Sequence, residues 1–351
     1  MTDYKESKEE KELNELFEGK STSNISKIVK KAKRITILRN IVISLLVIFF
    51  LSITLGFTWL SIMRWSQENA MRDIGLFSRI TDPNIEELGV QNEGNGLFEG
   101  ILTFNRHKEI EGIPVNWSDN VFTYSLFGGV SRLTGDHSPI QIQDDNDGGM
   151  NSYDRVTKQR MMTFYHPDVL YTTKLSDDLA SLNNVADDTL VELALSFDQK
   201  YSPKEVRELI PEGITLKWYW VDTYSKVDIE RINDRNVETS SGEEFDMEAL
   251  PELATEIYGF DEMLEDPENP LLSEQMFIGD IEMGVSLEEG KYHGEFERIY
   301  KQLKGNSSNL STENIHVIGA VVTGTASDLV KLKDVNTIRA TVLGVTANPH
   351  E

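Results

Sequence analysis

The sequence contains no cysteine and only six histidines among its 351 residues. The lack of cysteine excludes disulfide bonds, cysteine nucleophiles and zinc sites built on thiolates. No two histidines lie at the helical or hairpin spacing of a metal site, and neither a Gly-x-Ser-x-Gly nor a His-Glu-x-x-His pattern occurs. The six histidines are His107, His137, His166, His293, His316 and His350. The sequence therefore predicts a protein that is not an enzyme and that holds no metal or other cofactor.

Positive charge is also scarce, because 34 Lys and Arg residues face 59 Asp and Glu residues, for a formal charge of −25. The deficit is uneven: residues 1–39 carry ten basic and seven acidic side chains, so the negative excess lies entirely beyond them. A strongly acidic region argues against nucleic acid or anionic lipid as its ligand. No pair of carboxylates is singled out by spacing, so a solvated acidic surface explains them better than a hydrolase site.

The most prominent feature that is present is an apolar run. Residues 40–63 contain 24 positions without a charged side chain. As a helix they span roughly 36 Å, which exceeds the bilayer core of about 30 Å. The run ends in bulky residues and lacks the small-x-small cleavage site of a signal peptide, while Trp59 and Trp65 suit an interfacial aromatic belt. The run predicts one uncleaved transmembrane helix in the lipid bilayer.

The charges that flank this run predict its orientation. Residues 20–39 hold seven basic residues and no acid, whereas residues 64–90 hold three basic and five acidic residues. The positive-inside rule then places the N-terminus in the cytoplasm and the C-terminus outside the cell membrane. We expect a single-pass protein in four parts: a cytoplasmic stub 1–39, the transmembrane helix 40–63, an extracytoplasmic β-rich region 64–185 and a C-terminal α+β domain 186–351.

The region after the span mixes weak and clear signals. Residues 64–79 are expected to extend the helix, and the residues up to 95 are expected to form loops. Aromatic and β-branched residues predict strands over 96–105 and 121–127. The segment 143–149 contains three Asp residues and resembles a calcium-binding loop in composition. The twelfth position counted from Asp144 is Arg155 and not the Glu of an EF-hand, so we expect a solvated turn.

The C-terminal part repeats one order of elements. A strand over 190–197 precedes a helix that begins at Ser202-Pro203-Lys204-Glu205, and a second strand follows over 214–221. The same order of strand, helix and strand recurs over 315–345. Two βαβ-like units predict an α+β fold of the ferredoxin-like type, with extra strands.

An acidic insertion separates the two units. Residues 236–290 contain 17 acidic residues and no Lys or Arg. We expect one or two short helices on a mobile surface excursion. A firmer helix is predicted over 295–303, ended by Gly305.

The stub carries apolar residues at helical spacing in two groups. Because 39 residues cannot form a core of their own, two interpretations stay open. In one, these residues bind in the grooves of a partner and order on contact; in the other, the stub is a disordered tether whose basic patch touches anionic lipid. The candidate partner-binding residues are Leu13, Leu16, Phe17, Ile25, Ile28 and Val29.

Three segments resemble one family. The basic residues 27–34, running through Arg39 into the apolar span, resemble the N-terminal motif of sigma factor regulators. Two further segments resemble the C-terminal domain of that family. They contain the sequences Trp218-Tyr219-Trp220-Val221-Asp222-Thr223-Tyr224 and Val321-Val322-Thr323-Gly324-Thr325. Together the three segments extend over most of the chain.

The resemblance is to membrane anti-sigma factors of Gram-positive bacteria, of the type that holds the envelope-stress factor sigma-M. It implies that the cytoplasmic side sequesters an extracytoplasmic-function sigma factor and that the outer part responds to the envelope. The short stub leaves room for a second small membrane protein as co-regulator. The alternative is an extracytoplasmic envelope-binding or sensor module with a passive cytoplasmic tail.

Overall fold

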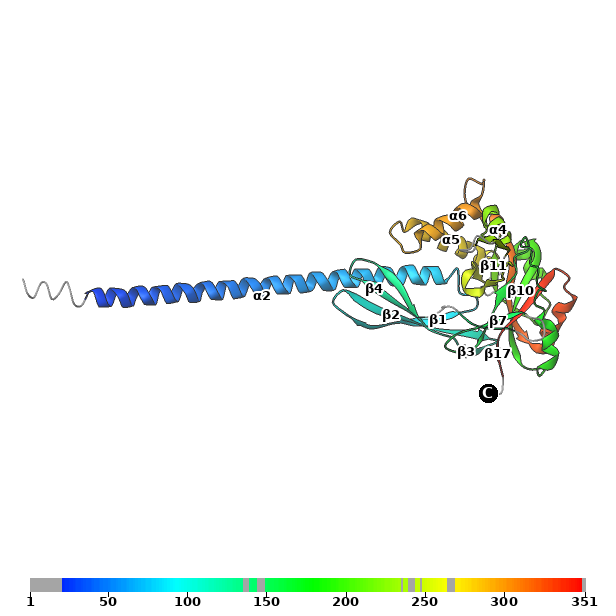
Figure 1. Ribbon diagram of the computed structural model, residues 1–351, viewed down its shortest axis with the longest axis horizontal. Helices are drawn as coiled ribbons and strands as arrows, with labels where there is room; N and C mark the ends of the chain where they lie inside the picture. Colours follow the sequence, from blue (N-terminus) through cyan, green and yellow to red (C-terminus); the bar gives the residue numbers. More distant parts are fainter. Residues whose placement is uncertain are drawn as a thin grey trace, which may run out of the picture. The chain divides into compact units, whose positions relative to one another are not determined.

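The computed structural model describes residues 21–134, 139–143, 149–234, 236–238, 244–246, 248–263 and 269–348. The chain divides into two compact units, Met1–Arg64 and Trp65–Glu351. The described residues form a mixed α+β protein, in which one long apolar helix precedes a β-rich unit with antiparallel sheets (Figure 1). The predicted fold class is confirmed.

Helix α2 (Ser21–Ser78) contains the apolar run. Its most apolar window has a mean hydropathy of 2.6 and no buried residue, and within the described ranges no other helix is long and apolar enough to cross a membrane. The hydroxyls of Thr54 and Thr58 donate hydrogen bonds to the carbonyls four residues earlier, at 2.8 and 2.9 Å. A helix in hydrocarbon must satisfy its polar groups internally in this way.

The second unit begins with a sheet in the order β1-β2-β4-β5, with β3 beside the far end of β2. Its strands are β1 (Glu86–Asn95), β2 (Glu99–Ile110), β3 (Ile113–Asn116), β4 (Asn120–Ser125) and β5 (Val130–Thr134). The expected strands at 96–105 and 121–127 are thus present with shifted ends. The loop expected before residue 95 is wrong, because β1 pairs along β2 although its own sequence is polar and contains glycines. Pairing with a neighbour, and not local propensity, determines this strand.

The central sheet has the order β15-β11-β16-β10-β17. Its strands are β10 (Leu190–Tyr201), β11 (Thr215–Val221), β15 (Gly259–Asp261), β16 (Val317–Thr325) and β17 (Ile338–Ala347). Strand β16 lies between the two strands of the first βαβ unit, and β10 lies between those of the second. This interleaving is the ferredoxin-like arrangement that the sequence predicted, with β15 added at one edge.

The helices of the two units begin where their capping residues predict. Ser202 and Glu205 form a capping box at the start of α3 (Pro203–Leu209). Thr325 accepts a hydrogen bond from the backbone of Asp328 at the start of α7 (Ala326–Leu329), which continues as a 3-10 helix, η4 (Val330–Asp334). Each cap satisfies a backbone donor that the first helical turn leaves free.

Both faces of the central sheet are buried because its strands alternate between two apolar clusters. On one face Leu193 and Leu195 pack with residues of α3, α7 and two further helices, α5 (Leu272–Ser286) and α6 (His293–Lys304). On the other face Trp218 and Trp220 pack with Phe164 and its neighbours. Such two-sided burial explains the nearly continuous apolar sequence of β10 and β16.

The acidic insertion takes part in this core. Helix α5 (Leu272–Ser286) buries Phe277 and Ile281, and β15 buries Phe260. The expectation of a surface excursion is therefore wrong for these residues. Phe277 and Ile281 are four residues apart and share one face of α5, although acidic residues surround them in the sequence. Helix α6 (His293–Lys304) lies beside α5, in yellow and orange in Figure 1, and ends at Gly305 as predicted.

The last turn of α2 and the residues just after it belong to the same core. Leu76 and Ile80 are buried in the cluster on the helix-covered face. The backbone N–H of Gly259, in β15, donates a hydrogen bond of 2.8 Å to the carbonyl of Ile80. The chain thus leaves α2 already joined to the edge of the central sheet.

Shorter elements complete the unit. They are β6 (Ile140–Gln143), β7 (Met150–Tyr153), β8 (Arg160–Met161), β9 (Thr163–Phe164), η1 (Asp178–Asn184), α4 (Lys226–Asn233), β12 (Asn236–Glu238), β13 (Glu244–Asp246), β14 (Glu252–Leu253), η2 (Ala254–Glu256) and η3 (Thr312–Asn314). The turn predicted around Asp144 lies mostly outside the described residues.

Candidate functional site

The candidate partner-binding residues fall in two groups. Leu13, Leu16 and Phe17 lie outside the described residues. Ile25, Ile28 and Val29 lie on α2 and are 57 %, 66 % and 58 % exposed. Residues at this spacing share one helix face, so they form an apolar stripe in solvent. Their role in binding stays a prediction.

The same helix changes character abruptly after this stripe. A basic segment that includes Lys30, Lys31 and Arg34 leads into the apolar window without a break in helical structure. Basic side chains at the end of a span suit the membrane surface, where they meet headgroups and water. Along the helix, the apolar stripe is thus followed by the basic segment and then by the candidate membrane span.

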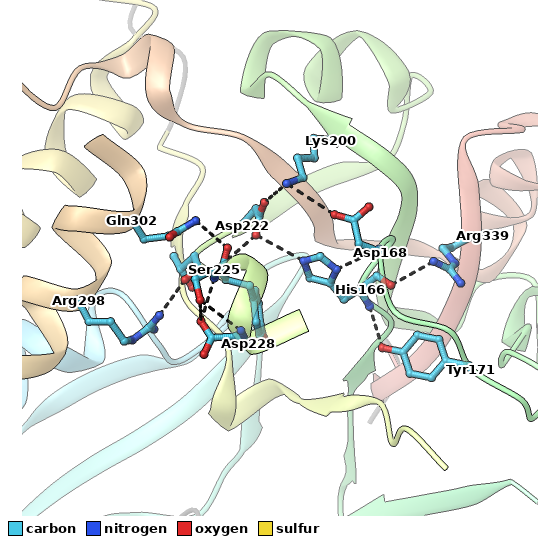
Figure 2. Close-up of polar contacts among 12 residues, drawn as sticks. His166, Asp168, Tyr171, Lys200, Asp222, Ser225, Asp228, Arg298, Gln302 and Arg339 are labelled. Atoms are coloured by element: carbon cyan, nitrogen blue, oxygen red, sulfur yellow. Dashed lines mark hydrogen bonds and ion pairs between the residues drawn. The ribbon is translucent and has the colours of Figure 1, made fainter. Parts of the chain in front are cut away.

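A polar site lies at the end of β11, where the Trp-Tyr-Trp-Val-Asp-Thr-Tyr segment leaves the sheet. Figure 2 shows the carboxylate of Asp222 between Lys200 and His166. The Nζ atom of Lys200 lies 2.5 Å from Oδ2 of Asp222, and Nε2 of His166 lies 3.4 Å from Oδ1. The backbone N–H of Tyr224 also donates to Oδ1, at 3.2 Å. Three elements far apart in sequence thus meet at one buried carboxylate.

These contacts decide the charge of Asp222. Burial by itself would raise the pKa of this carboxyl, but the hydrogen bonds and charges of His166 and Lys200 outweigh burial and hold the pKa below its ordinary value. Burial would likewise lower the pKa of Lys200, and its pairing with Asp222 raises that pKa instead. The site therefore keeps a charged pair at neutral pH.

His166 is held in one orientation by its neighbours. The backbone N–H of Asp168 donates to Nδ1 at 3.1 Å, so Nε2 carries the proton that faces Asp222. The guanidinium of Arg339 in β17 donates to the carbonyl of His166 at 3.1 Å, and the backbone N–H of His166 donates to the hydroxyl of Tyr171. These contacts join the loop after β9 to Asp222 on one side and to Arg339 of β17 on the other.

Helix α6 closes the other side of the site (Figure 2). Arg298 donates to the carbonyl of Thr223 at 2.8 Å, and Gln302 donates to that of Tyr224 at 2.7 Å. Ser225 then forms a capping box with Asp228 and starts α4. The contacts of Asp222, Thr223, Tyr224 and Ser225 thus make the site a junction of strands, loop and helix.

The structure therefore gives the segment that resembles the family a physical role. Its four apolar residues fill both faces of the sheet, and its last three residues form the junction. Sequence reasoning missed His166 and Lys200, since each lies in a segment without a motif. The one signal was Asp222, a carboxylate placed directly after four residues of a buried strand.

Two family models match the chain. Residues 9–115 match the sigma factor regulator N-terminal family, and residues 182–345 match the sigma factor regulator C-terminal family. Together the two matches cover more than three quarters of the sequence. The chain belongs to the sigma factor regulators. No curated protein and no solved structure matches it.

The family defines the general activity. Sigma factor regulators are regulatory and not enzymatic, and their partner is a sigma factor. Both domains, and the one candidate membrane helix among the described residues, fit a membrane anti-sigma factor. Among the residues that the structure describes, no three His, Asp or Glu side chains group as metal ligands.

Proposed function

We propose that this protein is a single-pass anti-sigma factor that holds an extracytoplasmic-function sigma factor at the inner face of the cell membrane. The observation that carries the proposal is the exposed stripe of Ile25, Ile28 and Val29 within the region that matches the N-terminal family. An apolar helix face in water lowers its free energy by binding in a groove of a partner.

The basic segment that includes Lys30, Lys31 and Arg34 supports a cytoplasmic location for this stripe, by the positive-inside rule. We assign residues 1–39 to the sigma-binding stub, 40–63 to the span, 64–185 to an extracytoplasmic β-rich region and 186–351 to the family's C-terminal domain. On this assignment the large folded unit lies outside, where it responds to the state of the envelope. We propose that the protein is of the type that holds sigma-M in Gram-positive bacteria.

Binding should depend on few large side chains. A helix in a groove owes its affinity to anchors such as Leu16, Phe17 and Ile28, and loss of one anchor typically costs about 2–4 kcal/mol, or roughly 30- to 1000-fold in affinity. The stub is short, so a second small membrane protein is proposed to complete the grip on the sigma factor.

The test places charge on the anchors. Leu16→Asp, Phe17→Asp and Ile28→Asp should release the sigma factor and raise transcription from its promoters, at equal protein abundance. Ile28→Leu, which keeps an apolar side chain, is the matched control and should stay repressed. Co-purification with the sigma factor measures the same loss directly.

The result also separates the two function classes. If all three Asp variants and a deletion of residues 1–34 leave transcription repressed in a correctly inserted protein, the stub is a passive tail. The protein would then be an envelope-binding or sensor module. If binding survives purification only with another membrane protein present, the co-regulator is established.

A further inference from the structure

Two neighbouring turns of the first sheet hold large apolar side chains in solvent. The β1–β2 turn carries Leu97 and Phe98, which are 73 % and 66 % exposed, and the β4–β5 turn carries Phe127, which is 88 % exposed. The backbone N–H of Leu126 donates to the carbonyl of Phe98 at 2.6 Å, so the turns lie side by side. We call Leu97, Phe98 and Phe127 the apolar tip. Single exposed apolar residues are ordinary, but three in adjoining turns mark a contact surface.

The apolar tip is fixed beside the helical residues that follow the span. The hydroxyl of Ser66 donates to the carbonyl of Ser125 at 2.6 Å. The side-chain amide of Asn92 and the hydroxyl of Tyr124 both donate to Oε1 of Gln67, at 2.8 and 3.2 Å. These three contacts come from β1 and β4, the strands that carry the turns. The tip therefore has a defined position relative to Ser66 and Gln67.

Those residues lie close to the end of the membrane span. The uncharged run ends at Met63, and Ser66 follows three helical residues later, a rise of about 4.5 Å. Phe127 follows Ser125 by two residues, so their Cα atoms are at most about 8 Å apart. The polar layer on each side of a bilayer core is roughly 5–7 Å thick. The apolar tip is thus within reach of that layer.

We propose that Leu97, Phe98 and Phe127 insert into the interfacial layer of the bilayer that α2 spans. The folded unit is then bound to the membrane at a second point besides the helix. Trp, Phe and Leu side chains bury at the boundary between headgroups and acyl chains, and Trp65, which is 52 % exposed, precedes Ser66 in α2. The inference requires the membrane span alone and is independent of sigma factor binding.

Charge and connectivity favour lipid as the occupant of this surface. Residues 92–100 and 124–131 contain Glu93 and Glu99 but no Lys or Arg. Lys291, which donates to the carbonyl of Val130 at 2.7 Å, and Arg132 offset these two acids without giving the surface a net positive charge, so attraction to anionic headgroups is not the main source of binding. Binding must come from apolar burial, which zwitterionic lipid provides as well. Because hydrogen bonds hold the tip beside residues next to the span, the effective concentration of lipid at the tip is high. The tip is then inserted most of the time even if its intrinsic affinity for lipid is weak.

The absence of cysteine makes a direct test simple. Phe98→Cys and Phe127→Cys, each introduced alone into the full-length chain, would carry an environment-sensitive fluorophore. Leu170→Cys is the matched control, because Leu170 is 78 % exposed and lies on the loop after β9. The labelled proteins are reconstituted in phosphatidylcholine vesicles with and without a lipid that bears a shallow nitroxide quencher. Quenching should be several-fold stronger at positions 98 and 127 than at 170.

The salt dependence and the protein concentration complete the test. Quenching at the tip should persist in about 1 M salt, where the Debye length is only about 3 Å. Equal quenching at all three positions would overturn the proposal. So would a dry environment at 98 and 127 that is insensitive to the lipid quencher and grows with protein concentration, since a second copy of the chain would then cover the tip.

Discussion

Lys108 and Glu192 form an ion pair in which the Nζ atom lies 2.9 Å from each carboxylate oxygen. Both side chains are buried, and the pair joins β2 of the first sheet to β10 of the central sheet. Asn84 and the backbone N–H of Val345 donate to the same carboxylate at 2.8 and 3.2 Å. A buried charge is tolerated only when its bonds are completed in this way.

Removing one partner of this pair should destabilise the protein strongly. Lys108→Met leaves the carboxylate of Glu192 without its cation, and we expect a loss of about 3–5 kcal/mol in the free energy of unfolding. Urea unfolding of the full-length chain in micelles, followed by tryptophan fluorescence, measures it. The double variant Lys108→Met/Glu192→Leu should recover part of the loss. Fully additive losses in this cycle would contradict a direct coupling between the two residues.

Two glycines of α5 should respond to alanine with opposite signs. A Cβ atom at Gly284 would lie 2.2 Å from the ring of Phe296, whereas at Gly279 it would meet nothing within 4 Å. Gly284→Ala should therefore separate α5 from α6 and lower the thermal unfolding temperature. Gly279→Ala should stabilise by about 0.5–1 kcal/mol, because alanine loses less backbone entropy in a helix. A loss of stability at both positions would show that α5 tolerates no added methyl group, against the packing described here.

The polar junction predicts a pH-dependent difference between the protein and Asp222→Asn. The folded-state pKa of Asp222 lies below its ordinary value of 3.8, so the ionised carboxylate stabilises the fold fully above that value. This contribution is lost as the pH falls through the lower, folded-state pKa. The difference in free energy of unfolding between the two proteins should therefore stay constant from neutrality down to a pH near 3.8, and shrink as the pH falls further.

Asp280→Asn provides a control of opposite sign. Burial raises the pKa of Asp280 more than Arg79 lowers it, so the folded protein binds the proton of this carboxyl more tightly than the unfolded chain does. Relative to the asparagine variant, the natural protein should lose stability as the pH rises through the folded-state pKa of Asp280. Chemical unfolding at a series of pH values measures both differences. Parallel pH profiles for the two variants would refute the assignment.

The orientation of the span can be checked with reporter fusions. A reporter that is active only in the cytoplasm should function when it is fused before Ile35, and one that is active only outside should function when it is fused after Pro83. The reason is the difference between seven basic residues without an acid before the span and the acidic balance after it. The reverse pattern of activities would invert the proposed location of the stub and of the folded unit.

Local sequence sufficed for elements whose signals agree with their surroundings. The capping box at Ser202 and the apolar strands around it predict β10, α3 and β11, and the second unit repeats them. Even the interleaved strand order followed from two adjacent βαβ units. Consistency between propensity, pattern and turn chemistry is what makes such segments predictable.

Other parts depend on contacts that no local pattern encodes. Strand β1 exists because β2 supplies its hydrogen bonds, and Phe277 is buried because α6 and the sheet surround it. The junction at Asp222 needs Lys200 and His166, which lie 22 and 56 residues away in the sequence. The acidic composition of residues 236–290 predicted that they are exposed to solvent, and it gave no sign of the buried contacts of Phe277.

The hydrogen bond from Gly259 to the carbonyl of Ile80 has a mechanical consequence. With Leu76 and Ile80 in the core, the last turns of α2 and the edge of the central sheet move as one piece. No swivel separates the folded unit from residues 65–80. A torque on the central sheet therefore acts on residues 65–80 directly, and it needs no change of fold to displace them.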